Sequence, residues 1–166
     1  MFIYFAPVPE TLEDLKKMYH QLAMKHHPDI GGSKEAMQAI NGEYEILFGR
    51  LKNVHKNVKG EKYEKPTNEV YSDFIAIIDV LIRLPNIVVE LCGKWLWITG
   101  DTKPHAKVFR SLGCQWASKK QAWFYHRPED VARSNGNYTL GEIRDMYGSK
   151  VISDNSTPHN PNPAID

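Results

Sequence analysis

Cysteines, a leader segment and long apolar runs are scarce or missing in this chain of 166 residues. The two cysteines, Cys92 and Cys114, are too few for a disulfide framework, so we expect a reducing compartment, the cytoplasm. No basic segment followed by an apolar run and a cleavage site opens the sequence, so no signal peptide is predicted. The apolar segment Val70–Leu84 is shorter than the ~20 residues that a membrane span needs, and no membrane association is expected.

Sequence signatures of catalysis and of metal binding are also missing. No GxGxxG, P-loop, HExxH or GxSxG pattern occurs. His105, His126, Cys92 and Cys114 do not form the closely spaced CxxC or HxxxH pairs that zinc sites use. We therefore expect no enzyme activity, no metal and no cofactor.

Charge of one sign is not in excess, because the formal net charge is only +1. The whole chain is therefore not a polyelectrolyte that binds nucleic acid or membranes by charge alone. It does contain 42% hydrophobic and 25% charged residues, which are ordinary values for a soluble protein with a packed core. The length fits one or two small domains.

The most informative motif is His27-Pro28-Asp29, which follows an amphipathic segment. Thr11 is the predicted N-cap of this segment, and Pro28 is expected to end it with His27 in an extended conformation. The apolar residues of the segment fall on one helical face, at Leu12, Leu15, Tyr19 and Leu22. The basic residues are predicted to lie off this face and to point into solvent: Lys16, Lys17, His20 and Lys25.

A glycine-bearing loop, Ile30–Ser33, leads into a second amphipathic segment. Ser33 is its predicted N-cap, and its apolar face contains Met37, Ile40, Tyr44 and Leu47. The expected structure is a pair of antiparallel helices with a rigid, charged loop at the tip. An ordinary helix cap and turn is the alternative for the three residues alone, whereas the two flanking helices favour a partner-binding loop.

Residues 11–50 resemble the J domain of DnaJ-class co-chaperones. The resemblance rests on residues 15–29, which end in the HPD motif, on Gly31-Gly32, and on residues 39–47. It implies that the HPD loop docks on a DnaK-type heat-shock ATPase, accelerates its ATP hydrolysis and so traps a client polypeptide. The residues that it assigns to partner binding are His27, Pro28 and Asp29 in the loop and Lys16, Lys17, His20 and Lys25 on the preceding helix, where His20 would make the attraction pH-sensitive.

The chain also departs from that family. His20-Gln21 stands where a basic pair is usual, and the first short helix is not evident in the apolar start Met1–Val8. No Gly/Phe-rich linker and no repeated CxxCxGxG zinc motif follow. The resemblance is therefore to a minimal or specialised J protein, such as the compact J proteins of viruses, phages and mobile elements.

A polar, lysine-rich stretch with Gly60 and Pro66 predicts a linker over residues 56–69. The helix predicted next, Val70–Leu84, is apolar around most of its circumference, with a polar stripe at Ser72, Asp79 and Arg83. Such a helix must be buried on several sides. It can pack on the two J-like helices, replace their missing first helix or form a homodimer, and burial within the chain is favoured.

Beyond Pro85 the pattern changes to short strands. Two predicted hairpins flank a short helix over Lys103–Leu112: Ile87–Leu91 with Lys94–Thr99, and Cys114–Trp116 with Ala122–His126. A capping-box pattern at Thr139 and Glu142 predicts a last helix that ends near Tyr147. The tail from Ser149 is expected to be disordered.

This C-terminal module is basic and holds all four tryptophans. Residues 85–127 contain seven Lys or Arg against Glu90 and Asp101. Cations interleaved with aromatic rings favour single-stranded nucleic acid or a client protein as the ligand, although tryptophans in small modules more often pack in the core. The candidate residues are Lys103, Lys107, Arg110, Lys119, Lys120 and Trp123. Residues 93–125 also resemble a small module of phage and mobile-element J proteins.

The predicted fold is α+β and has four parts. Residues 1–55 form a J-like helical hairpin, 56–69 a polar linker, 70–148 the central helix with a small basic Trp-rich α/β module, and 149–166 a disordered tail. The predicted function is a co-chaperone that engages a DnaK-type ATPase and targets it to a client through the C-terminal module. The alternative is a nucleic-acid-binding accessory protein of a phage or mobile element, in which the J-like helix pair is structural.

Overall fold

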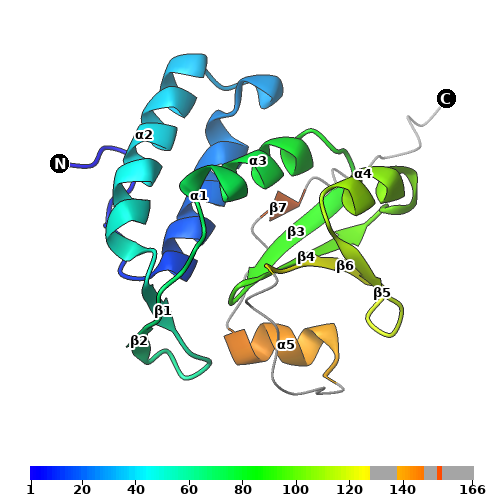
Figure 1. Ribbon diagram of the computed structural model, residues 1–166. Helices are drawn as coiled ribbons and strands as arrows, with labels where there is room; N and C mark the ends of the chain where they lie inside the picture. The colour runs from blue at the N-terminus through cyan, green and yellow to red at the C-terminus, as the bar shows by residue number, and fades with distance from the viewer. Residues whose placement is uncertain (128–137, 148–152, 155–166) are drawn as a thin grey trace, which may run out of the picture.

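The computed structural model describes residues 1–127, 138–147 and 153–154 of the chain. Its elements confirm the α+β class, with helices in the N-terminal half and an antiparallel sheet in the C-terminal half (Figure 1). The predicted disordered tail lies outside the described residues except for Ser153 and Asp154, which form a short strand. No helix within the described ranges is long and apolar enough to cross a membrane.

Helices α1 (Leu12–His26) and α2 (Lys34–Leu51) form the predicted antiparallel pair, and both begin after the predicted caps. Thr11 Oγ1 accepts a hydrogen bond from the backbone N–H of Asp14, and Ser33 Oγ accepts one from that of Ala36. The two helices share a buried apolar core, which contains Leu15, Tyr19, Ala23, Ile40, Tyr44 and Leu47. Tyr19 also donates a hydrogen bond to Asn41 Oδ1 at 2.9 Å, which fixes the two helices relative to each other.

The segment before α1 is irregular, in agreement with the missing first helix. Glu43 on α2 holds it in place, because its carboxylate accepts hydrogen bonds from the backbone N–H groups of Ile3, Tyr4 and Phe5. Phe5 is fully buried against the helix pair. The start of the chain is therefore part of the packed structure without forming a helix.

Residues 56–69, predicted as a polar linker, include most of a short hairpin of β1 (Val54–Lys56) and β2 (Lys62–Glu64). Buried His55 attaches this hairpin to α1, since its ring nitrogens lie 3.0 Å from Glu13 Oε1 and 3.1 Å from the carbonyl oxygen of Lys65. The sequence did not predict this hairpin, because its segment is polar. The hairpin is anchored by the hydrogen bonds of one imidazole, and such an anchor gives no apolar periodicity in the sequence.

Helix α3 (Tyr71–Ile82) lies between the helix pair and the sheet (Figure 1). Phe74 packs against Tyr19 and Tyr44, with ring centroids 6.0 and 6.4 Å apart. The same hydrophobic cluster continues to the sheet residues Leu91 and Leu96. Burial within the chain is thus what the structure shows, and the apolar residues of α3 are not available for the homodimer that the sequence left open: Phe74, Ile77, Ile78, Leu81 and Ile82.

Five antiparallel strands form the C-terminal sheet in the order β5-β6-β4-β3-β7. The strands are β3 (Ile87–Cys92), β4 (Trp95–Gly100), β5 (Gln115–Ala117), β6 (Ala122–Tyr125) and β7 (Ser153–Asp154). Both predicted hairpins are present, and β4 pairs with β6 to join them. The helix predicted between them is a short 3-10 turn, η2 (Lys103–His105), followed by α4 (Ala106–Ser111).

Different helices cover the two faces of this sheet (Figure 1). Helices α3 and α4 cover the face that carries Leu96 and Ile98, and this face belongs to the main core. Helix α5 (Leu140–Tyr147) covers the opposite face, where it packs on a smaller cluster that contains Trp97. Arg144 on α5 donates two hydrogen bonds to the buried carboxylate of Glu90 on β3.

Candidate partner-docking site

The HPD motif lies in a well-defined loop between α1 and α2. His27 leaves α1 in an extended conformation, with φ of −65° and ψ of 134°, and Pro28 begins a single 3-10 turn, η1 (Pro28–Ile30). The carbonyl oxygen of His27 accepts hydrogen bonds from the backbone N–H groups of Ile30 and Gly32, at 3.1 and 2.9 Å. The path of the loop is therefore set by the backbone itself.

Both glycines are needed for this path. Gly31 has a φ of +94°, in the left-handed region that favours glycine. Gly32 lies so close to α1 that a Cβ atom on it would be 1.9 Å from the carbonyl oxygen of His26. Glycine is thus favoured at position 31 by the left-handed backbone conformation and required at position 32 because a side chain has no space there.

The imidazole of His27 is turned into the protein. The backbone N–H of Asp29 donates a hydrogen bond to His27 Nδ1 at 3.2 Å, which places the ring proton on Nε2. Nε2 then donates to Asp79 Oδ1 on α3 at 3.1 Å. His27 is only 7% exposed, so it shapes the loop and does not present its ring to solvent. This corrects the expectation that the imidazole is an exposed docking group.

The carboxylate of Asp29 is about half exposed and already has a cationic neighbour. Arg83, just after the end of α3, donates a hydrogen bond from Nε to Asp29 Oδ2 at 2.6 Å. The side chains of Asp29 and Arg83 are 47% and 60% exposed, so this ion pair lies at the surface. Pro28 and Ile30 are also exposed. The outer edge of the loop therefore presents a proline ring, a carboxylate and an aliphatic side chain.

The basic residues predicted to face solvent on α1 have different environments. Lys25 is exposed, as predicted. Lys17 is half-buried, and this burial, followed by the nearby charge of Lys56, lowers the pKa of its ammonium group. Lys16 is largely buried and forms an ion pair with Glu69. The positive face of α1 is therefore smaller than the sequence predicted.

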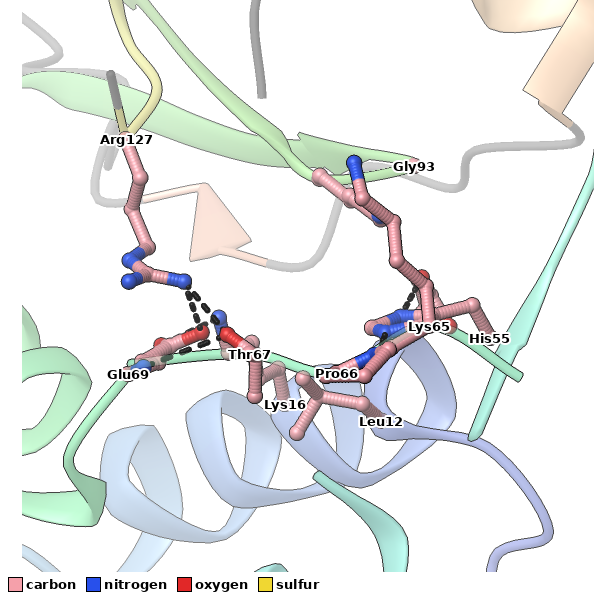
Figure 2. Close-up of a pocket in the computed structure, with 11 residues that line it drawn as sticks. Leu12, Lys16, His55, Lys65, Pro66, Thr67, Glu69, Gly93 and Arg127 are labelled. Atoms are coloured by element: carbon pink, nitrogen blue, oxygen red, sulfur yellow. Dashed lines mark hydrogen bonds and ion pairs between the residues drawn. The ribbon is translucent and has the colours of Figure 1, made fainter. Parts of the chain in front are cut away.

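Lys16 belongs to a polar cluster that joins α1 to the sheet (Figure 2). Glu69 lies between Lys16 and Arg127, and Arg127 also donates a hydrogen bond to Thr67 Oγ1 at 2.7 Å. The cavity beside these residues measures about 20 Å³, which is enough for a single water molecule. The expectation that Lys16 points into solvent is wrong, because its side chain is largely buried in an ion pair with Glu69.

His20 is the second correction on this helix. Its side chain is buried, with only 1% of the residue exposed, because α1 contacts α2, α3 and β1 and so has few solvent-facing positions. Burial lowers the pKa of His20 to about 4. The ring is therefore neutral at physiological pH and adds no switchable charge to the docking surface.

Asp79 and Arg83 are functional neighbours of the loop that the sequence did not assign to it. They were recognised only as the polar stripe of the central helix. Their spacing of four residues places them on one helical face, where Asp79 accepts a hydrogen bond from His27 and Arg83 pairs with Asp29. The sequence contained this signal, but the side against which α3 packs was needed to interpret it.

The candidate residues of the C-terminal module are separated by the sheet. Lys103, Lys107, Arg110 and Lys119 are exposed. Lys120 lies 5.9 Å from the ring centroid of Trp97, in the cluster under α5 on the opposite face. Trp123 is only 6% exposed, whereas Trp116 is 43% exposed.

Two observations concern metal binding and thiol chemistry in the described part of the chain. No group of three His, Cys, Asp or Glu residues in it is placed to hold a metal ion. Burial raises the pKa of the Cys114 thiol to about 11, so this cysteine is protonated and unreactive at neutral pH.

Comparison with curated proteins gives matches over the N-terminal part of the chain. The chaperone protein DnaJ of Finegoldia magna is 39% identical over 69 residues, which cover 39% of this chain and 18% of that protein. The DnaJ protein homolog 2 of Allium porrum is 51% identical over 37 residues, 22% of this chain and 9% of the homologue. The small t antigen of budgerigar fledgling disease virus is 46% identical over 35 residues, 21% of this chain and 24% of the antigen.

No protein-family model and no solved structure matches the chain. The matches to DnaJ proteins show that the N-terminal helical region is a J domain. The matched segments span less than a fifth of the length of each of those DnaJ proteins.

Proposed function

We propose that this protein is a co-chaperone that engages a DnaK-type heat-shock ATPase through its HPD loop and stimulates ATP hydrolysis by that partner. The observation that carries the proposal is the hydrogen-bonded HPD loop between the two helices of a J domain, with Pro28 and Asp29 at its exposed edge. A preformed loop loses little conformational entropy on binding. Lys25, in the last turn of α1, supplies positive charge near the loop, whereas Lys17 lies in the N-terminal half of the same helix.

Binding of the partner replaces a contact that the loop makes within the chain. Arg83 occupies the carboxylate of Asp29, and a cationic group of the ATPase would compete for the same oxygen atoms. The competition is favourable for the partner because an exposed ion pair contributes little stability. The partly buried contact between His27 and Asp79 can persist and keep the loop in shape.

In the same proposal the C-terminal module selects the client. It lies away from the HPD loop in sequence. The cytoplasm is the proposed location, because DnaK-type partners and a chain with only two cysteines both fit a reducing compartment.

The proposal is tested by the steady-state ATPase rate of a bacterial DnaK-type chaperone with and without this protein. Asp29→Asn is the informative variant, since it removes the charge and preserves the shape of the side chain. Glu45→Gln is the matched control, because Glu45 is an exposed carboxylate on α2 outside the loop. We expect the wild-type chain and the control to raise the rate and Asp29→Asn to leave it at the basal value.

Two results would contradict the proposal. One is a wild-type chain that leaves the ATPase rate unchanged at saturating concentration. The other is equal stimulation by the wild-type chain and Asp29→Asn, which would mean that the rate does not depend on the loop.

A further inference from the structure

A cleft on the C-terminal module is not used by the HPD loop. It has a volume of about 770 Å³ and opens between the η2–α4 segment and the β5–β6 hairpin. This volume falls within the roughly 300–1,000 Å³ of small-ligand sites. Its walls carry two tryptophans, two cations and one carboxylate: Trp116, Trp123, Lys103, Arg110 and Asp101.

The aromatic part of the cleft is a supported ring with an open side. Trp116 and Trp123 are cross-strand partners in the hairpin, with ring centroids 5.7 Å apart. Trp123 is itself fixed, because Phe109 lies 5.4 Å from it and the guanidinium of Arg110 lies 5.6 Å from its ring centroid. Trp116 is 43% exposed. A flat aromatic ring held from behind and open in front can stack on another planar group.

Three cations of the η2–α4 segment lie at or near this cleft. Lys103 and Arg110 line it, and Lys107 is in the first turn of α4, next in sequence to the lining residue Ala106. All three are exposed, and Lys119 adds a fourth exposed cation in the turn between β5 and β6. Positive charge therefore extends along one side of the cleft.

These cations form no ion pair with any carboxylate in the described ranges, which is also true of other exposed lysines such as Lys25, Lys52 and Lys59. Other lysines and arginines lie against a carboxylate: Lys16, Lys56, Lys62, Arg83, Arg127 and Arg144. Neighbouring cations without counter-charges repel one another, and a polyanion would relieve this repulsion. Asp101 lines the cleft, so a polyanion must follow the Lys103–Arg110 side.

We propose that this cleft binds a single-stranded nucleic acid, with one base stacked on Trp116 and the adjoining phosphates along Lys103, Lys107 and Arg110. An exposed ring combined with unpaired cations suits single strands, whose bases are accessible to stacking. A duplex buries its bases in the stack and offers Trp116 no partner. An acidic peptide would use the cations but would leave the ring without a planar group. The proposal does not depend on the co-chaperone function.

The test is a titration of the full chain into a fluorescein-labelled oligothymidylate of about 15 nucleotides, near the upper site size of single-strand-binding folds. Fluorescence anisotropy gives the dissociation constant between about 50 and 200 mM salt, the range in which phosphate contacts strongly affect affinity. A duplex of the same length is titrated in parallel. We expect the single strand to bind more tightly than the duplex.

Three variants separate stacking from charge. Trp116→Ala is expected to weaken binding about tenfold with an unchanged salt slope, since it removes one stacked base. Lys107→Gln with Arg110→Gln is expected to lower the slope of log affinity against log salt by about 1.4, that is, about 0.7 per lost phosphate contact. The matched control is Lys52→Gln with Lys59→Gln, which removes the same charge from exposed sites outside the cleft and should retain the wild-type slope.

Three outcomes would overturn the proposal. The first is the same affinity for duplex and single strand, which would indicate attraction by charge alone. The second is wild-type affinity in Trp116→Ala when circular dichroism shows that this variant is folded. The third is absence of binding at about 50 mM salt together with binding of an oligoglutamate peptide that Lys107→Gln with Arg110→Gln abolishes, which would assign the cleft to acidic peptides.

Discussion

At the scale of the residue, the HPD loop separates positions that shape it from positions that can touch a partner. His27 shapes the loop, because its ring bridges the backbone N–H of Asp29 and the carboxylate of Asp79. Pro28 and Asp29 form the exposed edge. Replacement of His27 therefore alters the conformation of the loop as well as its chemistry, whereas replacement of the Asp29 carboxylate tests a contact alone.

The two loop glycines should respond differently to alanine. Gly31→Ala meets open space, so only its positive φ opposes the change, at a cost of about 1–2 kcal/mol. Gly32→Ala would place Cβ against the carbonyl of His26 and force the loop to rearrange. We expect a larger loss in the free energy of unfolding for Gly32→Ala, measured by urea denaturation, and altered NMR signals of His27 in that variant. Equal losses would contradict the steric argument.

His20 should make stability depend on pH in the acidic range. Burial lowers its pKa from 6.5 to about 4, so between these values the unfolded chain binds a proton that the folded chain does not. The free energy of unfolding should therefore fall as the pH is lowered from about 6.5 to about 4, by about 3 kcal/mol from this group. His20→Leu should remove this part of the slope in urea unfolding at several pH values. An equal fall in the free energy of unfolding with falling pH in the wild-type chain and in His20→Leu would refute this prediction.

At the scale of the element, α3 connects the J domain to the sheet and also contacts the HPD loop. Its apolar side chains fill the space between the helix pair and the sheet, with Phe74 against Tyr19. Asp79 and Arg83, at and just beyond its C-terminal end, meet His27 and Asp29 of the loop. Because α3 packs in the core and Arg83 at its end pairs with Asp29, the access of a partner to the loop depends on the position of α3.

Removal of the charge of Arg83 should therefore favour partner binding. Arg83→Gln leaves the Asp29 carboxylate without its internal cation, so a cationic group of a DnaK-type ATPase meets no competitor. We expect half-maximal ATPase stimulation at a lower concentration of the variant than of the wild-type chain. Stability should change little, since the pair is exposed.

Asp73→Asn is the control for this experiment, because Asp73 lies in the first turn of α3 and contacts the Val70 backbone instead of the loop. It should require the wild-type concentration. If half-maximal ATPase stimulation needed a higher concentration of Arg83→Gln than of the wild-type chain or of Asp73→Asn, the result would show that Arg83 assists docking.

At the scale of the whole molecule, the J domain and the C-terminal sheet share one core. A single hydrophobic cluster includes residues of α1, α2, α3, β3, β4 and α4. The ion-pair cluster of Lys16, Glu69 and Arg127 adds a polar connection between α1 and the end of β6 (Figure 2). Both features predict that the helical and sheet regions unfold together.

The Glu69 carboxylate is the central group of that connection, and its loss should be costly. Glu69→Gln leaves two largely buried cations, Lys16 and Arg127, without their shared counter-charge. We expect a loss of about 3 kcal/mol in the free energy of unfolding, measured in urea, with a single transition. Glu10→Gln, which breaks an exposed pair with Lys62, should change it by less than about 0.5 kcal/mol. Two separate transitions in the wild-type chain would show that the regions are independent.

The sequence alone determined the local structure around the J domain. The caps at Thr11 and Ser33, the apolar faces of the two helices, the break at Pro28 and the glycine loop are all encoded within a few residues. The two C-terminal hairpins were predictable for the same reason, because alternation and turn residues act over short distances. The DnaJ-like HPD motif belongs to this local information.

The tertiary structure alone decided which polar side chains remain at the surface. Lys16 is largely buried and His20 is buried because α1 packs against three elements, and the His55 hairpin forms because α1 offers Glu13 as a partner. The contact of α3 with the HPD loop and the choice of Trp116 over Trp123 as the exposed ring also depend on chain segments far apart in sequence. Burial and charge pairing are properties of assembled surfaces, and periodicity within one segment does not specify its neighbours.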